Sequence, residues 1–196
     1  MSAGADGLPE GFPAGYGEPT TSYVLRVNGE ARLIENAWIG ENLLYVLRER
    51  LGLPGAKDGC GQGVCGTCTV QLDGVAVAAC LIAAATLGDR EVRTIEDLDN
   101  DTETGEVQRA LVEFGAVQCG YCVPGVVASA CALLARAPEP GEVEIRRALD
   151  GHPCRCAGPH PMVDAVRAAA RRRVPQETHS TMMFNVIAPP SAGGAE

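Results

Sequence analysis

The first half of the chain alternates short apolar runs with tight-turn signals, as the strands of an antiparallel sheet do. Residues 23–27 and 31–34 flank an Asn-Gly dipeptide, and residues 67–72 and 75–77 flank an Asp-Gly dipeptide. Either dipeptide between two such runs indicates a two-residue β-hairpin. Between the hairpins, apolar residues recur at helical spacing. The members of this helical pattern are Leu43, Leu44, Val46, Leu47 and Leu51.

A last strand is predicted at residues 91–94, which completes the first half of the chain. Two hairpins, one helix and one further strand predict a small α+β domain over residues 21–97, with the helix on one face of the sheet.

The second half shows the 3.6-residue periodicity of helices instead. The apolar face of the first helix and its stop signal are Val107, Ala110, Leu111, Phe114 and Gly115. Three more helices are predicted over residues 126–135, 142–149 and 162–173, and the first of these is apolar enough to be buried all round. Together they predict a compact four-helix domain over residues 104–174.

The remaining segments differ in composition from both halves. Residues 98–103 lie in an acidic stretch and are the expected linker between the domains. Residues 1–20 and 175–196 are rich in Gly and Pro or in small residues and show no periodicity, so we expect a disordered N-terminal extension and a disordered tail.

Composition narrows the classes of function. The 196 residues carry a formal net charge of −9, which disfavours nucleic acid as a partner. The two longest uncharged apolar stretches, 75–87 and 123–135, are each 13 residues, too short to span a bilayer. The first cation is Arg26, so no signal peptide is predicted and we expect a cytoplasmic protein. Nine cysteines in that reducing compartment indicate metal or redox chemistry.

Four of the cysteines have the spacing C-x4-C-x2-C-x11-C, and they are Cys60, Cys65, Cys68 and Cys80. The opening triplet is the spacing of plant-type ferredoxins, which bind a [2Fe–2S] cluster. Glycines at 59, 61, 63 and 66 let the loop curl tightly and let N–H groups approach the sulfurs. Zinc is the alternative, although zinc sites more often have paired C-x2-C knuckles.

A C-x2-C pair and a C-x-C pair form the second set, and they are Cys119, Cys122, Cys154 and Cys156. Pro124 predicts that a helix begins just after the first pair, where N-terminal amides favour anionic partners. Spacing alone leaves iron–sulfur and zinc both open. His152 and His160 suggest a Rieske-like site, but four cysteines already complete the set. Cys131 is expected to be a buried thiol.

Three segments taken in order, CGQGVCGTCTV, VQCGYCVPG and PCRCAG, resemble the small iron–sulfur subunit of molybdenum hydroxylases. This family includes xanthine dehydrogenase, aldehyde oxidoreductase and carbon monoxide dehydrogenase. The resemblance covers residues 21–173. It implies a β-grasp, plant-type ferredoxin-like domain followed by a four-helix [2Fe–2S]-binding domain, with one cluster on each set of cysteines.

The resemblance also implies a role without catalytic residues on this chain. Electrons would pass from molybdopterin, expected as the cytosine dinucleotide, through the helical-domain cluster and the ferredoxin-like cluster to FAD. The partners would be a large molybdopterin-binding subunit and a medium FAD-binding subunit, in a dimer of heterotrimers. Gln118 and Cys156 would lie beside the pterin.

Some positions depart from the family pattern. Relatives commonly have Asn-Leu before the C-R-C segment, where this chain has His152-Pro153, and Thr before the Pro-Gly, where it has Val123. These changes affect contacts around the second set and not the ligands. A free-standing two-cluster ferredoxin and a zinc-stabilised interaction module are the alternatives. The substrate, which would bind another chain, is left open, and the resemblance of VQCGYCVPG and EIRRAL to purine and aldehyde relatives slightly favours those two types.

Overall fold

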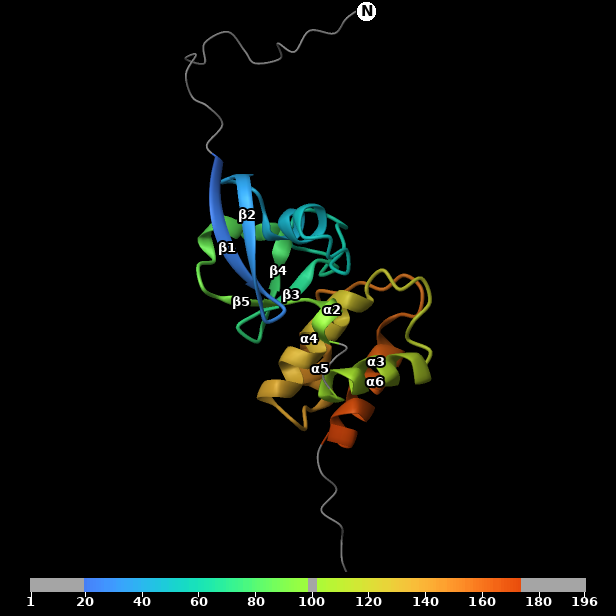
Figure 1. The fold of residues 1–196 in the computed structure, drawn as a ribbon. Coiled ribbons are helices and arrows are strands. Elements are labelled where there is room, and N and C mark those ends of the chain that lie inside the picture. Colours follow the sequence, from blue (N-terminus) through green and yellow to red (C-terminus); the bar gives the residue numbers. More distant parts are fainter. Residues whose placement is uncertain (1–19, 99–101, 174–196) are drawn as a thin grey trace, which may run out of the picture.

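The computed structural model describes residues 20–98 and 102–173, which form a sheet domain and a helical domain packed side by side (Figure 1). The strands are β1 (Thr20–Val27), β2 (Glu30–Trp38), β3 (Thr69–Leu72), β4 (Val75–Ala78) and β5 (Glu91–Arg93). Their order in the sheet is β2-β1-β5-β3-β4. β1 runs parallel to β5, and every other neighbouring pair is antiparallel.

Both predicted hairpins are present and have the expected turns. Asn28 and Gly29 have φ angles of 55° and 77°, and Asp73 and Gly74 have φ angles of 50° and 80°. Two successive residues with positive φ define the turn whose twist matches that of the flanking strands. The Asn28 amide also clamps the end of β5, because its Nδ2 donates to Thr94 Oγ1 at 2.9 Å and its Oδ1 accepts from Thr94 N at 2.9 Å.

The predicted helix of the sheet domain consists of α1 (Leu43–Tyr45) and a π-helical turn (Val46–Arg50). The Asn42 side chain caps its start by accepting a hydrogen bond from Tyr45 N at 2.8 Å. The buried face of this helix packs in one apolar core with the inner face of the sheet. The largest fully buried members of that core are Leu25, Leu43, Leu47, Val27, Val46, Val70 and Val92.

The helical domain contains α2 (Ile95–Leu98), α3 (Thr102–Glu113), α4 (Val123–Arg136), α5 (Glu142–Leu149) and α6 (Pro159–Arg173). The last four are the predicted helices, whereas the sequence pattern does not predict the short α2. Phe114, expected on the buried face of α3, is 43% exposed because it follows the end of that helix. α2 ends and α3 begins within the stretch expected as a linker.

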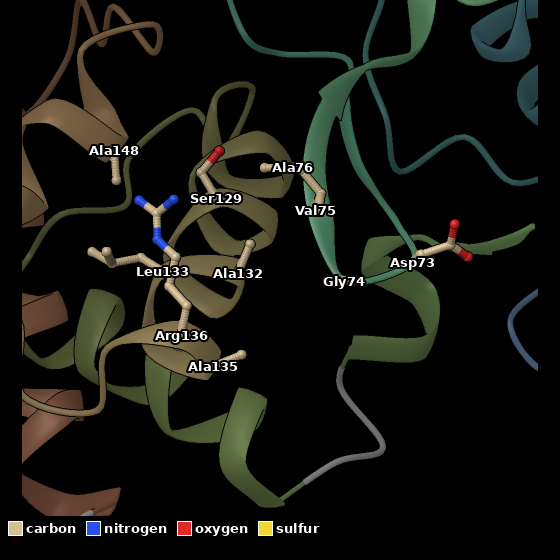
Figure 2. A pocket seen from close by; sticks show the side chains of 10 residues that line it. All are labelled: Asp73, Gly74, Val75, Ala76, Ser129, Ala132, Leu133, Ala135, Arg136 and Ala148. Carbon is tan, nitrogen blue, oxygen red and sulfur yellow. The ribbon is translucent and has the colours of Figure 1, made fainter.

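The two domains meet where α4 lies along β3 and β4 (Figure 1). At this interface the buried Gln71 side chain donates from Nε2 to the carbonyl of Ala128 at 3.0 Å. A hollow of about 410 Å³ separates the β3–β4 turn from the C-terminal half of α4, with Ser129 and Arg136 on its helix side (Figure 2). No helix in the described part of the chain is long and apolar enough to cross a membrane.

A very close approach between the domains joins two backbone segments. A Cβ atom added to Gly125, in the first turn of α4, would lie 2.1 Å from the carbonyl oxygen of Gly66 in the sheet domain. Backbone atoms cannot move aside as the end of a flexible side chain can. This contact therefore requires a residue without a side chain at position 125.

Gly125→Ala is expected to lower the free energy of unfolding by about 1–3 kcal/mol, because the domains must separate to admit the methyl group. The measurement is thermal or denaturant unfolding of the whole chain.

Gly105→Ala is the matched control. A Cβ there has its nearest neighbour, Arg109 Nη2, at 3.9 Å, and the site lies inside α3. This change is expected to raise the free energy of unfolding by about 1 kcal/mol. Equal effects of the two substitutions would contradict the close contact.

Candidate metal centres

The first cysteine loop curls through glycines whose backbone is left-handed. Gly61, Gly63 and Gly66 have φ angles of 61°, 70° and 66°, a conformation that residues with a Cβ rarely adopt. The curl directs backbone N–H groups at sulfur, and Gln62 N lies 3.4 Å from Cys60 Sγ. Such donors stabilise negative charge on a thiolate, as a metal-bound sulfur requires.

Two further contacts explain the small residues around the loop. A Cβ at Gly59 would lie 2.8 Å from Cys65 Sγ, and one at Gly63 would lie 2.3 Å from Leu81 Cδ1. The Thr67 hydroxyl donates to the carbonyl of Lys57 at 3.0 Å and lies 3.2 Å from Cys65 Sγ. The loop thus packs closely around its own sulfurs.

The fourth cysteine of this set returns to the loop by way of the β3–β4 hairpin. Cys80 lies in a 3-10 turn (Ala79–Leu81) that follows β4, and Ala79 N donates to the carbonyl of Cys68 at 3.3 Å. Cys68 and Cys80 are both buried. The spacing of eleven residues between them is therefore the length of one hairpin.

The thiols of the first set differ strongly in acidity. Backbone N–H groups, led by that of Gln62, lower the pKa of Cys60 to about 7, with a contribution from the neighbouring Cys65 thiol. Burial raises the pKa of Cys68 to about 11, and Cys80 contacts it. Since a metal ligand must be deprotonated, the binding of metal would have to overcome this burial at Cys68.

The second set is built around the start of α4. Cys122 is the residue that precedes this helix, and Pro124 lies in the first turn. Cys122 is buried beside the thiol of Cys154, and burial raises its pKa to about 11. Burial also acts to raise the pKa of Cys154, but the N–H groups of Ala157 and its neighbours outweigh that effect and leave the pKa below its ordinary value. Ala157 N lies 3.4 Å from Cys154 Sγ.

All eight cysteines of the two sets are free thiols, and six of them lie in three close pairs. The contacts are Cys60 with Cys65, Cys68 with Cys80, and Cys122 with Cys154. Within residues 20–98 and 102–173, no three His, Cys, Asp or Glu side chains are grouped to hold one metal ion. The two pairs of the first set agree with a two-iron cluster, which distributes its four ligands over two irons. In the second set Cys122 and Cys154 form one such pair.

The cysteines of the second set differ in their exposure to solvent. Cys122 is buried, whereas Cys119 and Cys156 are exposed, and Gln118 is also exposed. Cys131 is buried within the apolar core of α4 and its neighbours. The second set therefore has one edge at the surface, formed by Gln118, Cys119 and Cys156, whereas Cys131 lies in the helical core.

The two cysteine loops also contact each other, which cysteine spacing does not predict. The Tyr121 hydroxyl, between the cysteines of the C-x2-C pair, donates to the carbonyl of Asp58, two residues before Cys60. Gly66, between Cys65 and Cys68, meets Gly125 at the start of α4. A paired Gly-Gly contact between domains leaves no periodic trace in a sequence.

Comparison with known proteins assigns each half of the chain to a family of domains. Residues 25–94 match the family described as 2Fe-2S iron-sulfur cluster binding domain, and residues 94–167 match the family described as [2Fe-2S] binding domain. The chain therefore contains two domains of the kind that bind [2Fe–2S] clusters, and its α+β fold agrees with the prediction.

Relatives over most of the chain give the family. The nicotinate dehydrogenase small FeS subunit of Eubacterium barkeri is 41% identical over 76% of this chain and 94% of its own length. The xanthine dehydrogenase iron-sulfur-binding subunit of Escherichia coli O157:H7 is 43% identical over 65% of this chain and 80% of its own length. The structure of quinoline 2-oxidoreductase from Pseudomonas putida 86 superposes with a TM-score of 0.70 at 35% identity, covering 79% of this chain and 98% of that chain.

These matches identify the chain as a small [2Fe–2S] subunit of the molybdenum hydroxylase family. Its role is electron transfer within an oxidoreductase complex, without substrate chemistry of its own. The resemblance carried by the three cysteine segments is thereby confirmed.

The acidity difference within the first loop predicts selective alkylation of the metal-free chain. Because the thiolate is the reactive form, iodoacetamide should modify Cys60 with a midpoint near its pKa of about 7, while Cys68 stays protonated until about 11. Peptide mass spectrometry after short pulses between about pH 6 and 9 measures both rates.

Denaturant provides the control, since unfolded cysteines should all titrate near the ordinary value of about 8.5. A shared midpoint for Cys60 and Cys68 in the folded chain would refute the N–H donors at Cys60 and the burial of Cys68 as the causes of the difference.

Proposed function

We propose that each set of four cysteines holds one [2Fe–2S] cluster. The ligands of the first are Cys60, Cys65, Cys68 and Cys80, and those of the second are Cys119, Cys122, Cys154 and Cys156. The observation that carries this proposal is the close packing of three pairs of these thiols, with backbone N–H groups at 3.4 Å from Cys60 Sγ and Cys154 Sγ. When bound, each cluster accepts and releases one electron.

The protein supplies the surroundings of the two sites and a route between them. Buried Cys68 and Cys122 keep water from one side of each site, and the N–H donors stabilise the negative charge on the sulfurs. The loops meet at Gly66 and Gly125, so the path between the sites runs through close-packed backbone.

Each site also has one side at the surface, which supports two separate docking partners. The exposed residues Gln118, Cys119 and Cys156 form the edge of the second site, and we propose that they face molybdopterin. The first site has an apolar rim instead, where Val64 and Leu81 are 70% and 64% exposed. A rim of this kind suits a protein partner, which we propose is the FAD-binding subunit.

The proposed complex is a dimer of heterotrimers in the cytoplasm. Its large subunit would bind molybdopterin cytosine dinucleotide, and its medium subunit would bind FAD. Relatives that this chain covers over most of their length are themselves named as small subunits, which supports separate chains for the other cofactors.

For the large subunit we propose a nitrogen-containing aromatic ring as substrate. The relatives named for nicotinate, isoquinoline, nicotine and xanthine share this chemistry, and so does the quinoline enzyme. Aldehydes are the rival class, since an aldehyde oxidoreductase of Megalodesulfovibrio gigas is 40% identical over 75% of this chain.

Purification of the tagged chain from its native cells tests the proposal. Two larger chains, molybdenum and flavin should co-purify, with about four irons and four sulfides per copy of this chain. The complex should reduce an artificial electron acceptor with an N-heteroaromatic such as nicotinate or xanthine, and not with benzaldehyde. A chain that purifies alone with both clusters would favour the free-standing ferredoxin, and a colourless zinc protein would favour the interaction module.

Cysteine variants control the ligand assignment. Cys122→Ala should lose about half of the iron, because it removes one ligand of the second site. Cys131→Ala should keep all of it, since this cysteine lies in the helix that follows Cys122 but outside both sets. Loss of iron from Cys131→Ala with retention in Cys122→Ala would overturn the assignment.

A further inference from the structure

One imidazole lies at the junction of the two cysteine loops. His152 Nε2 lies 3.4 Å from Thr69 Oγ1, at the start of β3, and 3.2 Å from Ser129 Oγ, in the middle of α4. Both hydroxyls belong to buried residues, and they come from different domains. A single ring nitrogen thus connects the sheet domain to the helical domain.

The carbon side of the same ring packs against the glycine contact. A Cβ at Gly66 would lie 2.7 Å from His152 Cδ2, and a Cβ at Gly125 would lie 3.0 Å from it. The ring therefore occupies the space that these two glycines leave open. Its contacts with the two domains are both polar and steric.

The residues that His152 touches belong to the segments that carry the cysteines. Gly66 lies between Cys65 and Cys68, and Gly125 lies three residues after Cys122. His152 itself precedes Cys154 by two residues. The ring consequently contacts one segment of the first set and lies within or beside both segments of the second.

We propose that His152 is a positioning residue that holds the two cysteine sets in a fixed relative placement. No charge on the ring is needed, because neutral Nε2 either donates its one proton or accepts at its one lone pair, and this single bond is shared between the two hydroxyls, each of which can donate or accept. Since four cysteines complete the second set, the role of the imidazole is to join the domains. This inference rests on the proposed function, in which the placement of the sets governs how strongly two clusters interact.

The test compares His152→Ala with the parent in the fully loaded chain or complex. Two reduced [2Fe–2S] clusters held close together split each other's paramagnetic resonance signals, and the splitting depends on their separation and orientation. In the alanine variant this splitting should shrink while iron and sulfide stay at the parent value. Amide exchange at Thr69 N and Val126 N, which donate to the Gly66 and Cys122 carbonyls, should accelerate about tenfold.

A glutamine substitution distinguishes a positioning role of His152 from a general packing role. In His152→Gln the side-chain amide can reach the place of Nε2, so it should restore most of the splitting and of the exchange protection. His160→Ala is the matched control, because this exposed histidine follows the same C-x-C pair and its Nδ1 lies 3.5 Å from Arg146 within the helical domain. It should leave both measurements at the parent values.

Unchanged splitting and exchange in His152→Ala would overturn the proposal, as would an equal change in His160→Ala. If the alanine variant loses a cluster, Thr69→Val and Ser129→Ala provide the same test, because each removes one hydroxyl partner and leaves all eight cysteines in place. Parent-like splitting in both variants would then overturn the role of the hydrogen bonds.

The outcome for the proposed function is separate. A parent chain without two clusters would refute the function, whereas the exchange comparison would still decide whether His152 joins the domains.

Discussion

The contact between Gly66 and Gly125 is the constraint on which the arrangement of the molecule depends. A methyl group on Gly125 would lie 2.1 Å from the Gly66 carbonyl oxygen, so the two domains touch through bare backbone. Both glycines belong to segments that carry cysteines. The contact that fixes the two domains consequently also fixes the two proposed metal sites.

This constraint explains why the remaining polar groups of the interface lie where they do. Gln71 bonds the carbonyl of Ala128, Tyr121 bonds that of Asp58, and His152 bridges Thr69 and Ser129. The bonds of Gln71, Tyr121 and His152 with Thr69 cross the same interface as the glycine contact, and that of Tyr121 joins the two cysteine loops. Thr69 and Gln71 are buried, and a buried polar group that finds its partner across an interface favours one orientation, because other orientations would leave it unsatisfied.

The electron-transfer role follows from the same arrangement. Each cysteine set has buried thiols and, beside them, exposed residues. The two sets therefore face each other inside the molecule, and each also has one side that a partner can reach. The N–H groups at Cys60 and Cys154 favour anionic sulfur, whereas burial at Cys68 and Cys122 opposes it. Metal ligation has to supply the energy that burial costs, which couples cluster binding to folding.

Much of the fold is predictable from local signals in the sequence. Asn28-Gly29 and Asp73-Gly74 identify both hairpins, because only a few dipeptides accept two successive positive φ angles. The cysteine spacing predicts two sets of four, and the structure brings six of these thiols into three close pairs. Helix ends are harder to predict, since Phe114 continues an apolar period but follows the end of α3 and is exposed.

The junction is not predictable in the same way. Thr69 and His152 are 83 positions apart, and Gln71 and Ala128 are 57 apart, so no periodicity relates them. The sequence neighbours of His152 suggest a metal ligand, whereas its ring contacts residues of both domains. Contacts of this kind depend on how the domains dock, which a local pattern does not encode.

The most direct test of the account is diffraction from the loaded chain at the iron absorption edge. Two pairs of iron peaks are expected, with His152 between them. One pair is enclosed by Cys60, Cys65, Cys68 and Cys80, and the other by Cys119, Cys122, Cys154 and Cys156. Anomalous signal at the zinc edge alone, a single pair of iron peaks, or any of the eight cysteines turned away from metal would contradict it.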